Sequence, residues 1–216
     1  MKYAFLQIYT LFFLFYALNL SAKQQIYNWE RIKCTDGIEV FRRSIKNSNI
    51  VAFKGIAEIN ASIEKVLFVL LDNEHRVEWV SRLKSSKILE GDNKSFEYIA
   101  YQEFKLPWPM MNRYFIYKGI VKKSGKQIIL KMNSVYHDFT PKNTAIKAEL
   151  HHSYYRMKSL TKNKTKLEIE IYSDPKGGLP KWFANLIQKN WPYKTLKGIR
   201  NQVKKKFINC SLLPIE

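Results

Sequence analysis

The chain has 216 residues, with 37 lysines and arginines against 18 aspartates and glutamates, a formal net charge of +19 and 46% hydrophobic residues. This length is typical of one domain with a sizeable core. The composition excludes a disordered chain, a collagen-like repeat and a small disulfide-framework protein. The excess of positive charge indicates an anionic partner.

The first 22 residues differ from the rest of the chain. Lys2 precedes a nearly apolar stretch over residues 4–20, and small residues end that stretch. This order is typical of a secretory signal peptide, although the stretch also approaches the length of about 20 apolar residues that crosses a bilayer. We predict that residues 1–22 are a cleaved signal peptide, that residues 23–216 form one domain, and that this domain works in the periplasm or outside the cell.

Export argues against nucleic acid as the anionic partner. The remaining candidates are an anionic membrane surface, other envelope lipids and acidic glycans, which exposed lysines attract over a salt-screened range. The alternative is that the lysines keep an aromatic-rich domain soluble.

Cysteine is nearly absent, since Cys34 and Cys210 are the two in the chain. They are too few for a zinc site built from paired cysteines, and the sequence has no nucleophile-elbow or phosphate-loop motif. We therefore predict no catalytic residues, no metal and no cofactor. In an oxidising compartment the two cysteines would suit one disulfide, and two separate thiols are the equal alternative.

The N-terminal third combines helix and strand signals. A three-residue apolar spacing predicts a short helix that ends at an Asp-Gly turn, and two aromatic, β-branched stretches after it predict a hairpin. Asn60 or Ser62 then caps a helix with apolar residues at three- and four-residue spacing. The expected elements are a helix over 27–35, strands over 38–45 and 49–59, a helix over 63–71 and a short helix over 75–82.

The middle of the chain, from residue 85, has an apolar period of two. Leu167, Ile169 and Ile171 alternate with charged residues, as expected when one face of a sheet meets the core and the other meets water. An antiparallel meander covered on one side only is predicted. Its strands are expected over 87–90, 95–104, 113–123, 127–136, 144–158 and 166–173.

Residues 180–207 predict one long amphipathic helix. The segment opens with a proline suited to the first helical turn and carries apolar residues at helical spacing. Pro192 predicts a kink, because its ring removes a backbone hydrogen bond. The fold class is therefore α+β, with a strongly curved antiparallel sheet wrapped around a long C-terminal helix.

Several motifs resemble the START family, the steroidogenic-acute-regulatory-protein-related lipid-transfer domains, and in particular its exported bacterial members. The most specific segment is DPKGGLPKWFAN at 174–185. Leu71-Asp72 with Trp79, and the run LPWP at 106–109, are similar to other family patterns. One departure is Arg113-Tyr114-Phe115, where the family usually has Arg-Asp-Phe.

The resemblance implies a helix-grip fold with an internal apolar cavity that holds one lipid. The ligand would be a phospholipid, a fatty acid or a sterol-like molecule, bound by a monomer and transferred between membranes without catalysis. The positive charge favours a phospholipid or fatty-acyl ligand. Two alternatives remain: an enzyme of the same superfold, of cyclase or hydrolase type, with His152 as acid or base, and a cationic envelope-binding protein with a filled core.

Candidate cavity residues come from three strands and the last helix. Strict alternation over 144–158 puts His152, Tyr154 and Arg156 on the inward face, where a cation or imidazole would meet a lipid head group. The alternative is that His152 is an ordinary core histidine with its hydrogen bonds satisfied inside the protein, and that Arg156 reaches solvent at the end of the strand. The predicted lining residues are Tyr98, Met132, His152, Tyr154, Arg156, Trp182, Phe183, Leu186 and Tyr193.

The loop over residues 105–112 is the candidate membrane contact. It carries Trp108, Met110 and Met111 among prolines and beside cations. Tryptophan next to basic residues is typical of a membrane interface. The alternative is that these side chains fold back under the sheet.

Overall fold

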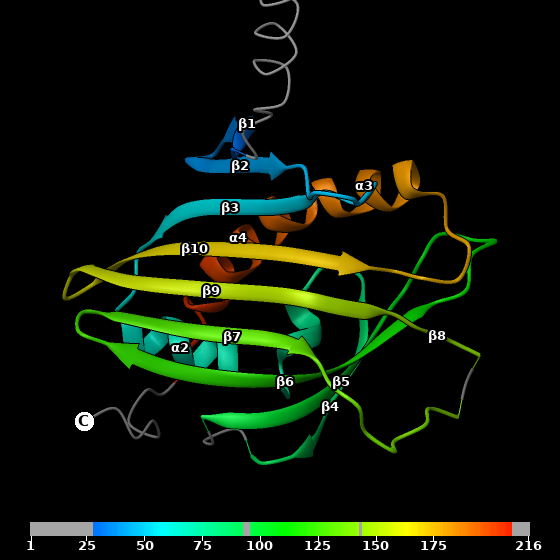
Figure 1. The fold of residues 1–216 in the computed structure, drawn as a ribbon. Helices are drawn as coiled ribbons and strands as arrows, with labels where there is room; N and C mark the ends of the chain where they lie inside the picture. The colour runs from blue at the N-terminus through cyan, green and yellow to red at the C-terminus, as the bar shows by residue number, and fades with distance from the viewer. Residues whose placement is uncertain (1–27, 93–95, 143, 209–216) are drawn as a thin grey trace, which may run out of the picture.

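The computed structural model describes residues 28–92, 96–142 and 144–208. Its main element is an open ten-stranded sheet in the order β1-β2-β3-β10-β9-β7-β6-β5-β4, with β8 paired in parallel to β6 (Figure 1). The predicted signal peptide and Cys210 lie outside the described residues, so the signal and the disulfide stay predictions.

The strands and helices follow the expected order along most of the chain. The strands are β1 (Glu30–Thr35), β2 (Ile38–Arg43), β3 (Ala52–Ile59), β4 (Leu83–Glu90), β5 (Glu97–Phe104), β6 (Arg113–Ser124), β7 (Gln127–Ser134), β8 (Ile146–Lys147), β9 (Glu149–Thr161) and β10 (Lys164–Asp174). The helices are α2 (Ile63–Leu71), α3 (Lys181–Lys189) and α4 (Trp191–Gln202), with one 3-10 turn, η1 (Arg76–Glu78).

The prediction of a helix over residues 27–35 is wrong, because Glu30–Thr35 is the edge strand β1. It forms a hairpin with β2 through Asp36 and Gly37, which both have positive φ, as tight hairpin turns with a matching twist require. Nearly all of β1 is exposed to solvent on both faces. A strand without a buried face has no period-two signal, so the spacing of two apolar residues imitated a helix.

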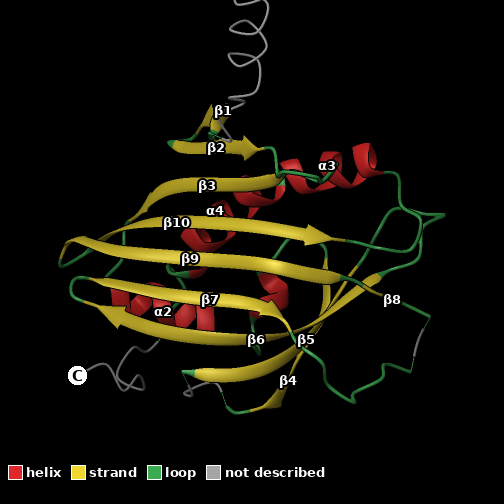
Figure 2. Ribbon diagram, viewed as in Figure 1, coloured by secondary structure: helices red, strands yellow, loops and turns green. Residues whose placement is uncertain are grey.

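The helices cover one face of the sheet, and none of the described helices lies on the other face, as Figure 2 shows. α2 begins at Ser62, whose hydroxyl accepts a hydrogen bond from the backbone N–H of Lys65. The short helix predicted over 75–82 is reduced to η1. The expectation of a sheet covered on one side is confirmed.

The long C-terminal helix is divided in two at Asn190, two residues before Pro192. The proline suits the first turn of α4 but cannot continue α3. α4 packs closely on β3, because a Cβ added at Gly55 would lie 2.8 Å from Leu196 and from Pro192. α4 is therefore a fixed part of the core, and α3 is a separate short helix.

β9 contains a β-bulge that changes which side chains face the core. Tyr172 of β10 pairs with His152, but Ser173 pairs with Leu150, so His151 is an extra residue. One extra residue reverses the face of every side chain that follows it in the strand. Leu150 points inward, and after the bulge the inward residues are Ser153, Tyr155 and Met157.

His152, Tyr154 and Arg156 therefore lie on the outer face, and their predicted place in the cavity is wrong. On that face Glu170 of β10 accepts hydrogen bonds from His152 Nε2 at 2.9 Å, Arg156 Nη1 at 3.2 Å and Arg43 Nη2 at 3.2 Å. Burial alone would raise the pKa of Glu170, but the hydrogen bonds from His152 and Arg156 outweigh it and lower the pKa. This carboxylate joins β2, β9 and β10.

The lowered pKa of Glu170 predicts a pH-dependent contribution to stability. A carboxyl whose pKa is lower in the folded state stabilises the fold at pH values above its ordinary pKa of 4.5 and loses that effect as the pH falls through the folded value. Glu170→Gln should lower the free energy of unfolding by about 2 kcal/mol near neutral pH. Denaturant unfolding at a series of pH values measures this, and the difference from the unmodified protein should shrink below pH 4.5.

Glu58→Gln is the matched control, because Glu58 is an exposed carboxylate with one partner, Lys164. Its effect should be small at every pH. A Glu170→Gln effect of the same size at acidic and neutral pH would contradict the prediction.

Candidate functional site

A cavity of about 330 Å³ opens between the end of the sheet and α3. Its walls are mainly apolar and come from β5, β6, β10, α3 and the start of α4, with Arg82, Lys105 and Arg113 among the polar residues of the lining. The main apolar lining residues are Phe104, Phe115, Ile171, Leu179, Phe183, Leu186, Ile187 and Trp191. The size and lining of this cavity are those of a small-molecule site. We call the open side of the cavity, beside α3, the mouth.

A smaller compartment of about 50 Å³ lies deeper, and it shares Phe104, Phe115, Ile171 and Trp191 with the first. The two compartments are therefore neighbours on opposite sides of the same four side chains. The deeper one ends at Arg76, with Gln102, Tyr117, Met132, Ser153 and Tyr155 around it. The interior therefore runs from an apolar mouth to a polar inner end.

Arg76 is a buried cation, with 5% of its surface exposed. Its Nη1 donates to the hydroxyl of Tyr117 at 3.0 Å, and its Nη2 donates to the carbonyl oxygen of Leu70. Nε has no partner, and no carboxylate of the described ranges forms an ion pair with this guanidinium. Because an uncompensated buried charge costs several kcal/mol, the inner end is suited to an anionic group.

Three tyrosines surround this guanidinium: Tyr98, Tyr117 and Tyr155. Burial raises the pKa of each phenol, so all three stay protonated and neutral. Burial alone would lower the pKa of Arg76, but the nearby phenol oxygens act the other way and the net shift is upward. The guanidinium is therefore charged at every physiological pH.

Gly119 of β6 makes room for the ring of Tyr98. A Cβ at this position would lie 2.7 Å from Tyr98 Cε1 and 2.8 Å from its hydroxyl oxygen. The missing side chain lets the Tyr98 ring lie across β6, with the ring centroid 6.3 Å from that of Tyr117.

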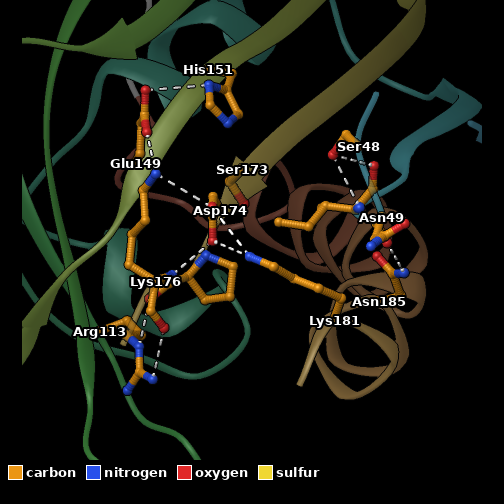
Figure 3. Close-up of polar contacts among 12 residues, drawn as sticks. Ser48, Asn49, Arg113, Glu149, His151, Ser173, Asp174, Lys176, Lys181 and Asn185 are labelled. Carbon is orange, nitrogen blue, oxygen red and sulfur yellow. Dashed lines mark hydrogen bonds and ion pairs between the residues drawn. The ribbon is translucent and has the colours of Figure 1, made fainter. Parts of the chain in front are cut away.

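Arg113 holds together the two loops that border the mouth. Its Nε donates to the carbonyl oxygen of Pro175 at 2.6 Å and its Nη2 to that of Lys176 at 3.2 Å (Figure 3). Its Nη1 donates to the carbonyl oxygen of Met111 at 2.5 Å. Burial lowers the pKa of Arg113. A further cavity of about 420 Å³ lies beside it and Phe183, between the two loops.

α3 is attached to the sheet by one polar stripe. Lys181 Nζ lies 3.2 Å from Asp174, and Asn185 donates to the carbonyl oxygen of Asn49 at 3.0 Å (Figure 3). Asn185 also accepts from the backbone N–H of Val51 at 3.1 Å. Ala184 is the buried residue of this helix. Polar contacts, more than a packed core, therefore keep α3 in place.

Apart from His152, Tyr154 and Arg156 on the outer face, the other six predicted lining residues are distributed over four positions. Met132 lines the inner compartment, and Tyr98 is buried beside it, with its hydroxyl 4.0 Å from the Met132 sulfur. Phe183 and Leu186 line the mouth, and Trp182 lines the further cavity. The predicted place of Tyr193 in the cavity roof is wrong, because its hydroxyl donates to Asp36 at 2.6 Å, on the outside of α4.

The predicted membrane loop is exposed. Trp108 has 92% of its surface accessible, Met111 is also exposed and Met110 is half-buried. Trp182, at 69%, lies across the further cavity from Met110 and Met111. The loop does not fold back under the sheet.

Other sequence candidates do not reach the cavity. His152, the acid or base of the enzyme hypothesis, faces away from it, and Cys34 is an exposed thiol. Among residues 28–92, 96–142 and 144–208, no group of three or more histidine, cysteine or acidic side chains is arranged to hold a metal. Within the same ranges no helix has the length and apolar character to cross a bilayer.

Sequence reasoning missed Arg76, Tyr117, Tyr155 and Trp191. Arg76 stands next to other charged residues, and nothing in the local pattern marks it as buried. Tyr155 follows the bulge at His151, and nothing in the residue spacing of the strand marks that bulge. Only the fold brings these residues together.

The START domain family model matches residues 14–205. An uncharacterized protein of Pseudomonas aeruginosa is 21% identical over 180 residues, covering 83% of this chain and 88% of that protein. The phosphatidylcholine transfer protein of Bos taurus is 25% identical over 168 residues, covering 75% of this chain and 78% of that protein.

Two solved structures share the fold. The STAR-related lipid transfer protein of Xanthomonas axonopodis has a TM-score of 0.73 and 22% identity, covering 82% of this chain and 99% of that chain. Human StAR-related lipid transfer protein 5 has a TM-score of 0.75 and 17% identity, covering 87% and 92%. Since the family model spans most of the sequence, and the helix-grip arrangement agrees with it, this chain belongs to the START domain family.

Proposed function

We propose that the protein binds one phospholipid, with its phosphate at Arg76 and its acyl chains in the apolar interior, and carries it between membranes. The observation that carries this proposal is a buried guanidinium, without a carboxylate partner among the described residues, at the inner end of an apolar cavity. Relatives named phosphatidylcholine transfer protein support the ligand class.

The chemistry of Arg76 favours a phosphate over a neutral lipid. A guanidinium offers several N–H donors in a fixed plane, and phosphate oxygens accept them in pairs. A sterol would bury its apolar body but leave the charge uncompensated. A fatty acid supplies a carboxylate, and analysis of the bound lipid distinguishes it from a phospholipid.

The mouth supplies the route of entry. Exposed apolar side chains surround it, led by Trp108 and Trp182, and such residues beside cations suit contact with a bilayer surface. Contact with lipid would replace the polar stripe that holds α3, while α4 keeps its place on β3. Burial of acyl chains, at roughly 25 cal/mol per Å² of apolar surface, then drives uptake.

The place of action follows from the signal-like N-terminus. A protein exported by that segment would exchange lipid in the periplasm or outside the cell. Cell fractionation with an antibody to the mature domain locates the protein.

Arg76→Met tests the phosphate site. Because a buried unpaired charge does not stabilise a fold, the variant should fold at least as well as the unmodified protein. It should bind phospholipid about 10- to 100-fold more weakly, as expected when charge-assisted hydrogen bonds are lost. Native mass spectrometry with lipid extraction measures the load.

Arg156→Met is the matched control, since it removes an arginine from the outer face of the sheet. It should retain the lipid. Equal phospholipid loads in Arg76→Met and the unmodified protein would rule out the proposed site.

Trp108→Ala tests the mouth as the membrane contact. We expect transfer between vesicles to become several-fold slower while the bound amount at equilibrium stays the same, because the residue contacts the membrane and not the cavity. A fluorescent phospholipid transfer assay measures the rate. Tyr136→Ala, which removes another exposed aromatic at 85% accessibility, should leave the rate unchanged.

Asn185→Ala tests the attachment of α3. Loss of two hydrogen bonds to the 49–51 segment should raise hydrogen exchange in α3 and speed lipid release, while α4 keeps its protection. Asn201→Ala, on the exposed side of α4, is the control. Equal protection of α3 in both variants would show that the polar stripe does not hold it.

A further inference from the structure

Six lysines gather at the end of the sheet far from the mouth. They lie on two neighbouring hairpins, β6–β7 and β9–β10, whose turns both lie at the left of Figure 1, while α3 lies at the right. β10, with 11 residues, runs from one end to the other and spans about 36 Å. The distal lysine cluster consists of Lys122, Lys126, Lys158, Lys162, Lys164 and Lys166.

Strand register makes these lysines one surface. β7 pairs with β9, with Gln127 opposite Lys158, and β9 pairs with β10, with Lys158 opposite Lys166. The β6–β7 turn is therefore beside the β9–β10 turn. Lysines from both turns form a continuous basic end.

Little negative charge neutralises this end. Lys164 forms an ion pair with Glu58 at 3.2 Å, and the other five lysines of the cluster are exposed and form no ion pair within the described part of the chain. Lys158 and Lys166 face each other directly, and like charges at such positions destabilise a sheet. The cluster therefore works against folding stability.

The side chains of the two hairpins indicate the kind of anion. Residues 122–127 and 158–166 contain no arginine and no aromatic residue, which are the side chains that read sugars, bases and individual phosphates by stacking or paired hydrogen bonds. Lysines act as diffuse point charges, which suits a surface of many anionic head groups. Exposed Leu160, between Lys158 and Lys162, adds a shallow apolar contact.

We infer that the distal lysine cluster is a second membrane-contact site, for a bilayer surface rich in anionic phospholipid. The inference rests on the proposed function in one respect, that the mouth contacts a membrane too. Because the two sites lie at opposite ends of the sheet, one molecule can touch two bilayers. The distal contact holds the protein near an anionic membrane while the mouth faces another.

The test compares two triple variants. The first, Lys126→Gln/Lys158→Gln/Lys162→Gln, removes three charges from the distal lysine cluster. The second, Lys87→Gln/Lys131→Gln/Lys142→Gln, is the control and removes the same charge from exposed positions outside the cluster. Vesicles of mixed phosphatidylcholine and phosphatidylglycerol are the probe, with pure phosphatidylcholine vesicles for comparison. Both triple variants are made in a Trp108→Ala background, and their affinity for the vesicles is measured by cosedimentation at low salt. The first triple variant should bind on the order of 100-fold more weakly, because each lysine contributes roughly fivefold to the affinity. The second triple variant should change far less.

Vesicle clustering, followed by light scattering, distinguishes two contacts from one. The unmodified protein should cluster the anionic vesicles, and the cluster variant should bind them without clustering. Equal clustering by the two triple variants, or capture of soluble polyphosphate in preference to vesicles, would overturn the inference. The amount of bound lipid, measured by native mass spectrometry, should be the same in both triple variants as in the unmodified protein. A loss of bound lipid would indicate failure of the proposed function instead.

Discussion

A guanidinium enclosed by apolar walls and neutral phenols is the feature on which the proposed function depends. Arg76 donates hydrogen bonds to Tyr117 and to Leu70, its guanidinium also interacts with the hydroxyl of Tyr98, and its Nε has no partner. A protein selected for stability alone would place a hydrophobic residue there. In the proposed function, the lipid phosphate would supply the negative charge that this guanidinium lacks within the protein.

The division of the C-terminal helix gives this binding site a fixed wall and a separate cover. α4 lies on Gly55 at a distance that a methyl group would prevent, and its buried side chains belong to the main core. α3 has Ala184 as its buried residue and is attached by polar contacts of Lys181, Asn185 and Gln188. Elements with few buried contacts open at low free energy, so the inner compartment can stay formed while the mouth opens.

The two faces of the sheet serve different purposes because of one inserted residue. The bulge at His151 turns Tyr155 toward Arg76 and turns His152 and Arg156 toward Glu170. Without the bulge, His152 and Arg156 would point into the apolar interior, and the phenol of Tyr155 would point out of it. The bulge thus separates the ligand site from the charged network on the outer face.

The sequence predicted the parts of the fold that have a buried side. The alternation of Leu167, Ile169 and Ile171 and the helical spacing from Ile63 to Leu71 were sufficient, since each follows one core face. β1 was missed because a strand exposed on both faces carries no period. The site was harder to predict. A bulge leaves no mark on the spacing of β9, and the three tyrosines around Arg76 come from β5, β6 and β9, which are distant from it in the chain.

The most direct measurement is an experimental structure of the protein loaded with phosphatidylcholine. The proposed function predicts the lipid phosphate within hydrogen-bonding distance of Arg76 Nε or Nη, with acyl chains against Phe104, Phe115 and Ile171. A lipid whose head group stays at the mouth, with the Arg76 guanidinium keeping its protein partners alone, would contradict it.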